Sequence, residues 1–285
     1  RSRPATAPTR RPAAARPTLK LRPYQLLCLV CSLGDEDGGP RDERYARLGE
    51  VIRNDPDVPV SLVCNAGDVY CYQDPGTQDD TPEGRDYNRK RDLDVLQILD
   101  LEPGATLPAR AMLMTLLKRI STVAGLCAYP AATSAAWKGC PKAASGRYEQ
   151  GHQKGIAALV PPRTEEDMKA EKKKSIDTLN RAEEVTIRPH ILLCSVCQYG
   201  GGLRPPYAAD NLPELLELIL TKKPDLRIKM ARGADWMMCA PCPQRAPKLN
   251  ACVNVLGSGG LSNEKRDLDM LQKLGLEFGS VTKAR

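Results

Sequence analysis

Apolar and polar residues follow one another in the C-terminal part of the chain in patterns typical of both strands and helices. The apolar run HILLCSV at 190–196 has the length of a buried strand, and LRIKMA at 226–231 alternates as a strand does. Between them, NLPELLELILTKK at 211–223 repeats its leucines at helical spacing. SNEKRDLDMLQKLG at 262–275 begins with capping residues, aligns three leucines and closes with glycine. The pattern predicts a β-α-β unit, a long loop and a second helix.

The same order of segments occurs earlier in the chain. RPYQLLCLVC at 22–31 matches RPHILLCSVC at 188–197, and KRDLDVLQILDL at 90–101 matches KRDLDMLQKLGL at 265–276. We therefore predict an α/β protein of two tandem β-α-β-loop-α repeats with Cys-rich loops, each repeat having neighbouring parallel strands. The expected parts are an arm over 1–20, repeat one over 21–120, a connector over 121–187 and repeat two over 188–285.

The segments outside the shared pattern are also informative. In repeat one, ARAMLMTLLKRI at 109–120 predicts a further amphipathic helix. The connector begins as an irregular stretch rich in small residues that holds Cys127 and Cys140. It ends with RTEEDMKAEKKKSIDTLNRAEE at 163–184, whose dense charge predicts a solvated helix.

The positive charge of the chain is concentrated in its arm. The net charge is +7, and the first 22 positions hold seven basic residues and no acid; removing these seven from the 42 basic side chains leaves 35, equal to the 35 acidic ones. A neutral body with few aromatic residues lacks the stacking platforms and basic groove of a nucleic-acid binder. We expect the arm to be disordered and solvated, with at most a weak contact to nucleic acid.

The apolar segments are too short to cross a bilayer. No run of 18 or more apolar residues occurs, so we expect no membrane span. The cytoplasm is the favoured compartment, and export after N-terminal processing is the alternative, because the Arg-, Ala- and Pro-rich start would also fit beside a removed targeting segment. The sequence leaves open whether the chain forms a homo-oligomer.

The eleven cysteines are more than packing alone explains. Their odd number and repeated C-x-x-C pairs argue against a framework of disulfides, whereas two intervening residues suit two ligands of one metal. Repeat two also contains MMCAPCPQRAPKLNACVN at 237–254. Its prolines and the glycines on either side of it favour a loop that wraps around a bulky group. An iron–sulfur cluster of the 4Fe-4S type is the expected cofactor, with one or two per chain. Zinc is the alternative, although the 41 residues between Cys197 and Cys239 exceed the usual ribbon spacing of about 15–20.

The RPHILLC opening, the Cys-rich loop and the KRDLDMLQKLGL helix together resemble a small prokaryotic domain family of unknown function. That family has been suggested to bind iron–sulfur clusters through its cysteines. The resemblance covers about 187–285 and, more weakly, repeat one. It implies that the ligands in repeat two are Cys194, Cys239, Cys242 and Cys252, with Cys197 as an extra cysteine.

Repeat one retains only part of this pattern. It keeps the C-x-x-C pair, has a tyrosine in place of the motif's histidine, and lacks counterparts of two loop cysteines. Either it lost its site and buries its cysteines, or other thiols replace the missing ones. The candidate ligands are Cys28, Cys31, Cys64, Cys71, Cys127 and Cys140.

Three other residues of repeat two are candidates for the surroundings of a metal centre. His190 could ligate, relay a proton or hydrogen-bond a cluster sulfur, and a packing or supporting role is favoured because repeat one has Tyr24 there. Lys265 and Arg266 could offset the negative charge of a tetrathiolate cluster, or simply be solvated.

Motifs of common enzymes are absent. There is no Gly-rich phosphate loop, no G-x-S-x-G and no H-E-x-x-H in the required form, and two histidines make a triad improbable. We expect an iron–sulfur protein that passes or senses electrons with a redox partner protein, rather than a stand-alone enzyme. The alternatives are a module stapled by zinc or disulfides and, third, a thiol oxidoreductase that uses a C-x-x-C pair.

Overall fold

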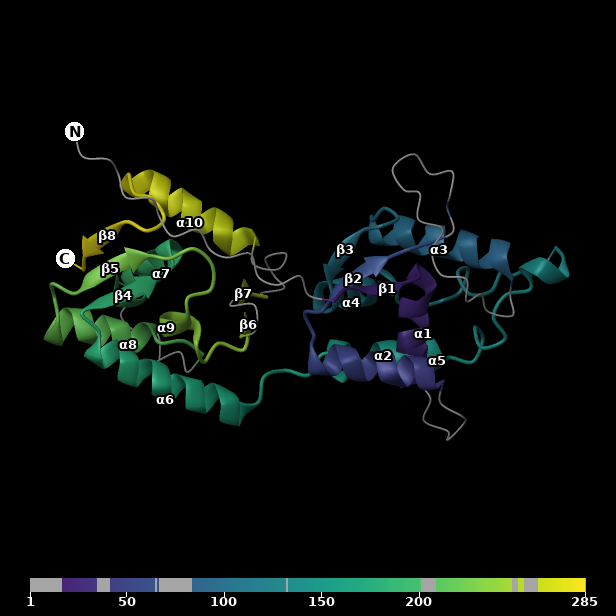
Figure 1. Cartoon of the computed structure of the whole chain (residues 1–285), viewed down its shortest axis with the longest axis horizontal. Coiled ribbons are helices and arrows are strands. Elements are labelled where there is room, and N and C mark those ends of the chain that lie inside the picture. Colours follow the sequence, from purple (N-terminus) through teal and green to yellow (C-terminus); the bar gives the residue numbers. More distant parts are fainter. Residues whose placement is uncertain are drawn as a thin grey trace. The chain divides into compact units, whose positions relative to one another are not determined.

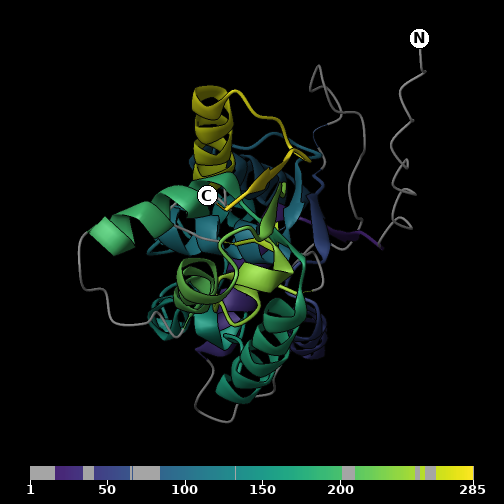
Figure 2. The same cartoon turned by 90° about the vertical axis from the view of Figure 1, so that its left-hand side faces the viewer.

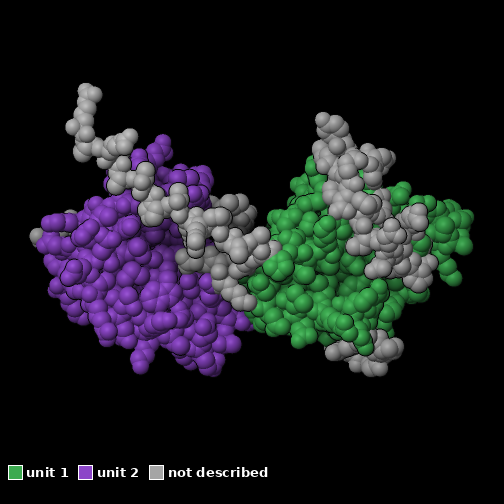
Figure 3. Space-filling view, in the orientation of Figure 1, with its two compact units in different colours: residues 1–161 green, residues 162–285 purple. Residues whose placement is uncertain are grey.

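The computed structural model describes residues 17–34, 42–64, 66, 84–131, 133–200, 209–247, 251–253 and 261–284. The chain divides into two compact units, residues 1–161 (unit 1) and residues 162–285 (unit 2), coloured separately in Figure 3. Each unit has a small three-stranded sheet, packed helices and its own apolar core. The α/β class expected from the sequence is therefore confirmed.

Unit 1 forms around a central helix (Figure 1). In Figure 1, α1 lies between α3 on one side and α2 with α5 on the other, and α1 contacts all three helices. The elements of unit 1 are β1 (Leu19–Leu21), α1 (Pro23–Leu33), α2 (Glu43–Asn54), β2 (Pro59–Leu62), α3 (Arg85–Leu99), β3 (Thr106–Pro108), α4 (Ala109–Arg119), η1 (Ala135–Trp137), α5 (Arg147–Lys154) and η2 (Ile156–Ala158).

Unit 2 places helices on both sides of its sheet. Figures 1 and 2 show α6 and α10 on opposite sides of the β4–β5–β8 sheet. The elements of unit 2 are α6 (Glu165–Arg181), β4 (Glu184–Ile187), α7 (Pro189–Gly200), α8 (Leu212–Glu217) continued by the π-helical turn η3 (Leu218–Lys222), β5 (Arg227–Met230), α9 (Trp236–Cys239), β6 (Arg245–Ala246), β7 (Ala251–Cys252), α10 (Leu261–Leu274) and β8 (Val281–Lys283).

The two sheets have the same strand order and directions. In unit 1, β1 pairs with β2 in parallel, with Leu21 beside Leu62, and β2 pairs with β3 antiparallel. In unit 2, β4 pairs with β5 in parallel, with Val185 beside Ile228, and β5 pairs with β8 antiparallel. A parallel pair needs a helical crossover, so the helices between these strands must pack over the sheet.

One sequence prediction about the sheets is wrong. The apolar run HILLCSV is not a strand but the first part of helix α7, and its counterpart in unit 1 is helix α1. The first strands are instead β1 and β4, which come directly before the Arg-Pro pairs. Pro23 and Pro189 occupy the first position of their helices, where the missing N–H costs no hydrogen bond.

The other predicted elements agree with the structure. LRIKMA forms β5, the segment at 262–275 forms α10, and the segment at 109–120 forms α4. Gly275 ends α10 with a positive φ of 64°, as its place after the last leucine predicts. The helix predicted at 211–223 is shorter as an α-helix, because it becomes π-helical from Leu218.

The boundary between the units falls inside the predicted connector. Residues 121–161 pack into unit 1, where Leu126, Cys127 and Tyr148 join the apolar core. The charged segment forms α6 as predicted, but its Ser175 and Leu179 are buried within unit 2. Residues 1–16 of the arm lie outside the described residues, and its last residues enter β1.

Within the described part of the chain, no helix combines the length and the apolar character needed to cross a membrane.

Candidate metal centres

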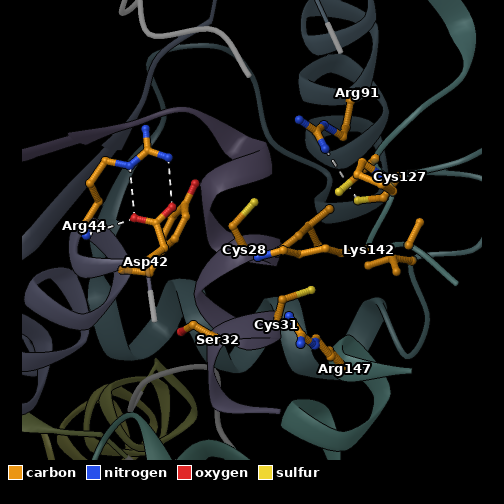
Figure 4. Close-up of a pocket in the computed structure, with 15 residues that line it drawn as sticks. Cys28, Cys31, Ser32, Asp42, Arg44, Arg91, Cys127, Lys142 and Arg147 are labelled. Atoms are coloured by element: carbon orange, nitrogen blue, oxygen red, sulfur yellow. Dashed lines mark hydrogen bonds and ion pairs between the residues drawn. The ribbon is translucent and has the colours of Figure 1, made fainter. Parts of the chain in front are cut away.

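Four cysteines of unit 1 line one cavity. Cys28 and Cys31 lie on one face of α1, three residues apart, whereas Cys127 and Cys140 come from the segment after α4. These four side chains line a cavity of about 250 Å³, many times the ~30 Å³ share of one water molecule. Figure 4 shows the labelled sulfur atoms of Cys28, Cys31 and Cys127 arranged around this space. The structure thus brings together thiols that are about a hundred residues apart in the sequence.

The loop that carries Cys127 and Cys140 is held by its own backbone. The N–H of Cys127 donates to the carbonyl of Val123 at 2.9 Å, and the N–H of Cys140 donates to the carbonyl of Cys127 at 2.7 Å. Gly139 precedes this contact with a φ of 82°, and a Cβ there would lie 2.7 Å from the Cys127 carbonyl oxygen. Only glycine tolerates both conditions, so Gly139 sets how closely the two cysteines approach.

Helix α5 packs closely against α1. A Cβ on Gly151 would lie 2.0 Å from the carbonyl oxygen of Val30, and one on Gly34 would lie 2.0 Å from that of Arg147. The two backbones therefore meet where neither helix has a side chain. Glu149 of α5 also accepts from the hydroxyl of Thr122 and the N–H of Val123, so the helix packed against α1 is bonded to the segment that leads to Cys127.

Burial raises the pKa of two of the four thiols of this cavity. It raises the pKa of Cys127 to about 12, an effect that Arg91 opposes. It also raises the pKa of Cys31 well above its usual range, and the neighbouring thiols Cys28, Cys127 and Cys140 add to this. A metal that binds here must displace protons, and its charge would then stabilise the thiolates.

Positive side chains surround the four thiols. Arg44, Arg91, Lys142 and Arg147 line the same cavity. Among the described residues of the lining, Asp42 is the one carboxylate, and Arg44 holds it through two hydrogen bonds of 3.1 and 2.8 Å. The cavity therefore suits a group of negative charge.

Of the other two candidates of repeat one, Cys64 is described by the structure and Cys71 is not. Cys64 follows β2 and is fully buried in the apolar core, where burial raises the pKa of its thiol to about 11. It is not among the residues that line the cavity. Cys71 lies outside the described residues.

In unit 2, Cys239, Cys242 and Cys252 gather in the Cys-rich loop. Cys239 ends α9, and the N–H of Cys242 donates to its carbonyl at 3.0 Å. The short β6–β7 hairpin then places Cys252 opposite Arg245. Burial raises the pKa of Cys239 beyond its usual range, and the charges of Cys242 and Cys252 act in the same direction. The Asn263 side chain of α10 donates to Cys252 Sγ at 3.5 Å.

Polar side chains from outside the loop hold it in place. Nη1 of Arg163 donates to the carbonyls of Ala240 and Cys242, at 2.7 and 2.9 Å. Nδ2 of Asn211 donates to the carbonyl of Met237 at 2.6 Å, and the indole of Trp236 donates to Glu171 of α6. The charged helix that the sequence predicts as solvated therefore supports the Cys-rich loop.

The remaining candidates of repeat two have other surroundings. Cys194 and Cys197 lie on α7 with exposed side chains. Nδ1 of His190 is 2.6 Å from Asp267, at the start of α7. Lys265 and Arg266 are both exposed, and Lys265 pairs with Asp269, so the solvated interpretation of these two cations is the one that the structure supports.

A single zinc ion and an iron–sulfur cube need different spacings of their ligands. Four thiolates around one zinc ion, at about 2.3 Å each, would lie only about 3.8 Å from one another. Over the described ranges, no group of three or more His, Cys, Asp or Glu side chains is gathered tightly enough to hold a single ion. Four thiols line the open cavity of unit 1, and four thiolates are the ligand number that both zinc and a cube of iron and sulfide take.

Two features of the sites were missed at the sequence level. The sequence offered Cys127 and Cys140 among six candidate ligands of repeat one, but the set of four with Cys28 and Cys31 was not selected, although Cys140 precedes a proline as Cys242 does. The ion pair between the arginine of each Arg-Pro pair and the first aspartate of each RDLD sequence was also missed; these pairs are Arg22–Asp92 and Arg188–Asp267. Its signal was present, because the same opposite charges recur in both copies.

A comparison with protein-family models, with curated proteins and with solved structures finds no match to this chain.

Proposed function

We propose that this chain is an iron–sulfur protein that passes or senses electrons, with one centre in unit 1 held by Cys28, Cys31, Cys127 and Cys140. The observation that carries the proposal is the convergence of these four thiols on one cavity. Two of them come from a helix and two from a loop far along the chain. Four thiolates are the usual ligand set of a 4Fe-4S cluster.

The shape of the site argues against ordinary core cysteines. Buried cysteines that act only as small apolar residues pack against their neighbours and leave no void. Here they line a cavity of about 250 Å³ together with Arg91 and Lys142. Arg91 is buried beside this space, and an anionic group within the space would help to offset the cost of burying its charge.

Charge also favours a cluster over a neutral cofactor. Four thiolates and a cube of iron and sulfide carry net negative charge, which the surrounding arginine and lysine side chains would balance. When bound, the cluster would supply one-electron chemistry, and the chain would supply ligands, charge and partial exclusion of water. A redox partner protein would exchange electrons with it.

Unit 2 supports a second centre. Cys239, Cys242 and Cys252 share one loop, and Cys194 of α7 is the proposed fourth ligand, with Cys197 as the extra cysteine. The alternative for this unit is a zinc ion that staples the loop, because a C-x2-C pair followed by a short hairpin is also common in zinc knuckles.

The test is metal analysis of the full chain after anaerobic purification. The proposal expects a brown protein with about four iron and four sulfide per occupied centre, bleached by dithionite. A colourless protein with stoichiometric zinc and no sulfide would contradict it and support the stapled module. Thiol counts that rise on reduction of a metal-free protein would instead reveal disulfides.

A further inference from the structure

Arg91 is a buried cation held against one thiol of the unit 1 cavity. It is only 1% exposed, and its Nη1 lies 3.7 Å from Cys127 Sγ. Its Nη2 donates to the side-chain oxygen of Asn88. The guanidinium also lies over two aromatic rings, 4.2 Å from the centroid of Tyr24 and 5.4 Å from that of Tyr87. These contacts fix the direction in which Arg91 points.

The same aromatic group ties Arg91 to the loop of Cys127. The hydroxyl of Tyr87 donates to the carbonyl of Leu126 at 3.1 Å, so the ring under the guanidinium is bonded to the residue before Cys127. A guanidinium hydrogen bond to sulfur strengthens when the sulfur becomes a charged thiolate. Arg91 is therefore placed to act on a metal ligand, and not only to fill the core.

The residue of unit 2 that is equivalent to Arg91 has different surroundings. Arg266 holds the same place in the KRDLD element but is exposed. Carboxylates act on thiols in both units, Asp235 on Cys239 and Asp210 on Cys242 in unit 2 and Glu149 on Cys31 in unit 1.

The cations of unit 2 share their surroundings with acids. Arg188 is bonded to Asp267, and Arg163 is bonded to Asp167. Arg245 has charged acidic neighbours as well, Glu171 and Asp235. In unit 1 Arg91 likewise acts on a carboxylate, that of Asp92. The difference between the units therefore lies in the contacts to sulfur, because the charged guanidinium of Arg91 donates to Cys127 Sγ whereas the neutral amide of Asn263 donates to Cys252 Sγ.

We propose that Arg91 raises the reduction potential of the unit 1 centre above that of the unit 2 centre, so that an electron entering the protein comes to rest in unit 1. Reduction adds a negative charge to a cluster, and a buried cation that donates to its ligand sulfur stabilises the reduced form. Arg91 would act on the cluster through the sulfur of Cys127 and not as a ligand, so it is a positioning residue. The inference depends on the proposed function, because it requires clusters in both units.

The experiment is a potentiometric titration of the full chain, followed by visible absorption and electron paramagnetic resonance. The wild type should show two reduction steps. Arg91→Gln should lower the potential of the higher step alone. Arg266→Gln, at the same position of the other repeat, should leave both potentials unchanged. If Arg91→Gln and Arg266→Gln gave the same titration as the wild type, the inference would be overturned.

Two further variants make the result independent of how well Arg91→Gln folds. Arg91→Lys keeps the charge and should keep the higher step nearer its wild-type potential than Arg91→Gln does. Cys242→Ser should remove the lower step and leave the higher one; loss of the higher step instead would assign it to unit 2 and overturn the inference. A wild type without iron would overturn the proposed function itself, whereas a brown wild type with an unshifted Arg91→Gln would overturn only the inference.

Discussion

Asp267 accepts two hydrogen bonds from Arg188, from Nε at 2.9 Å and from Nη2 at 2.7 Å, although both side chains are almost fully buried. The other carboxylate oxygen accepts from the backbone N–H of His190 at 3.1 Å and lies 2.6 Å from its Nδ1. One carboxylate of α10 therefore fixes both the residue before α7 and the first turn of α7.

Unit 1 contains the same arrangement. Nε of Arg22 donates to Asp92 at 2.7 Å, and the N–H of Tyr24 donates to the same carboxylate at 3.0 Å. The Arg-Pro and RDLD elements, which are about 70 to 80 residues apart, thus form one structural link in each unit. This link sets where the C-x-x-C pair on the following helix lies.

Replacing Asp267 by Asn should destabilise unit 2 strongly. Arg188 would remain buried with its charge no longer balanced, a change that typically costs about 3–5 kcal/mol. Hydrogen exchange of the full chain measures this effect, because amides of α7 and α10 should lose protection while those of α1 and α3 serve as an internal reference.

Asp269→Asn is the matched control for that variant. Asp269 is two residues away on the same helix, is partly exposed and pairs with the exposed Lys265. Surface ion pairs contribute only about 0–1 kcal/mol, so exchange in unit 2 should hardly change. Equal effects of the two substitutions would contradict the structural role given to Asp267.

The contribution of Asp267 should depend on pH. Burial alone would raise its pKa, but the bonds from His190 and the charge of Arg188 hold the pKa below its ordinary value of 3.8. Because the folded pKa is lower than the unfolded one, the stabilisation is complete above the unfolded value and is lost as the pH falls through the folded one. The difference in protection between wild type and Asp267→Asn should therefore shrink from about pH 6 to about pH 3. A difference that stays constant over this range would show that the charge of Asp267 is not its source.

The sequence predicted the helices with clear amphipathic spacing and failed where a helix is buried on most sides. In α1, Leu26, Leu27, Leu29 and Val30 are all buried, so its apolar run has no polar face and looks like an interior strand. The proline after Arg22 was the available signal, since proline is common at the first position of a helix.

The candidate centre of unit 1 was only partly predictable for a different reason. The repeat pattern identifies Cys28 and Cys31, but Cys127 and Cys140 follow α4 in a segment that has no counterpart in repeat two. Comparison of the copies therefore could not pair them. Their approach depends on a tertiary contact, the backbone of α5 against that of α1, which no local spacing encodes.

Substituting the cysteines of unit 1 should separate ligands from core residues. Cys127→Ser and Cys140→Ser should each abolish about half of the iron and sulfide if both centres are occupied, because each removes one of four thiolates. Cys64→Ala changes a buried cysteine that does not line the cavity and should retain the metal, with a loss of stability of about 1 kcal/mol. Iron and sulfide assays on the three purified variants decide this, and a loss of iron in Cys64→Ala comparable to that in Cys127→Ser would contradict the ligand set.

Gly151→Ala should weaken the unit 1 centre without touching a ligand. Alanine usually stabilises a helix by about 1 kcal/mol relative to glycine. At Gly151 the new Cβ would lie 2.0 Å from the carbonyl oxygen of Val30, and because that oxygen belongs to the backbone, α5 must move away from α1. Overpacking of this kind costs about 1–3 kcal/mol, so the clash outweighs the gain in propensity. The shift would also separate the loop of Cys127 from Cys31, and we expect less iron per chain and faster hydrogen exchange in α5.

Gly49→Ala provides the comparison for that variant, because Gly49 lies inside α2 and its added Cβ would meet the flexible end of Arg53 at 3.2 Å and the side chain of Leu29 at an ordinary contact distance of 3.6 Å. A long side chain can move aside, so the helix propensity of alanine should prevail and the melting temperature should rise slightly. If Gly151→Ala proved as stable and as rich in iron as Gly49→Ala, then the close backbone contact would not be what brings the two pairs of cysteines together.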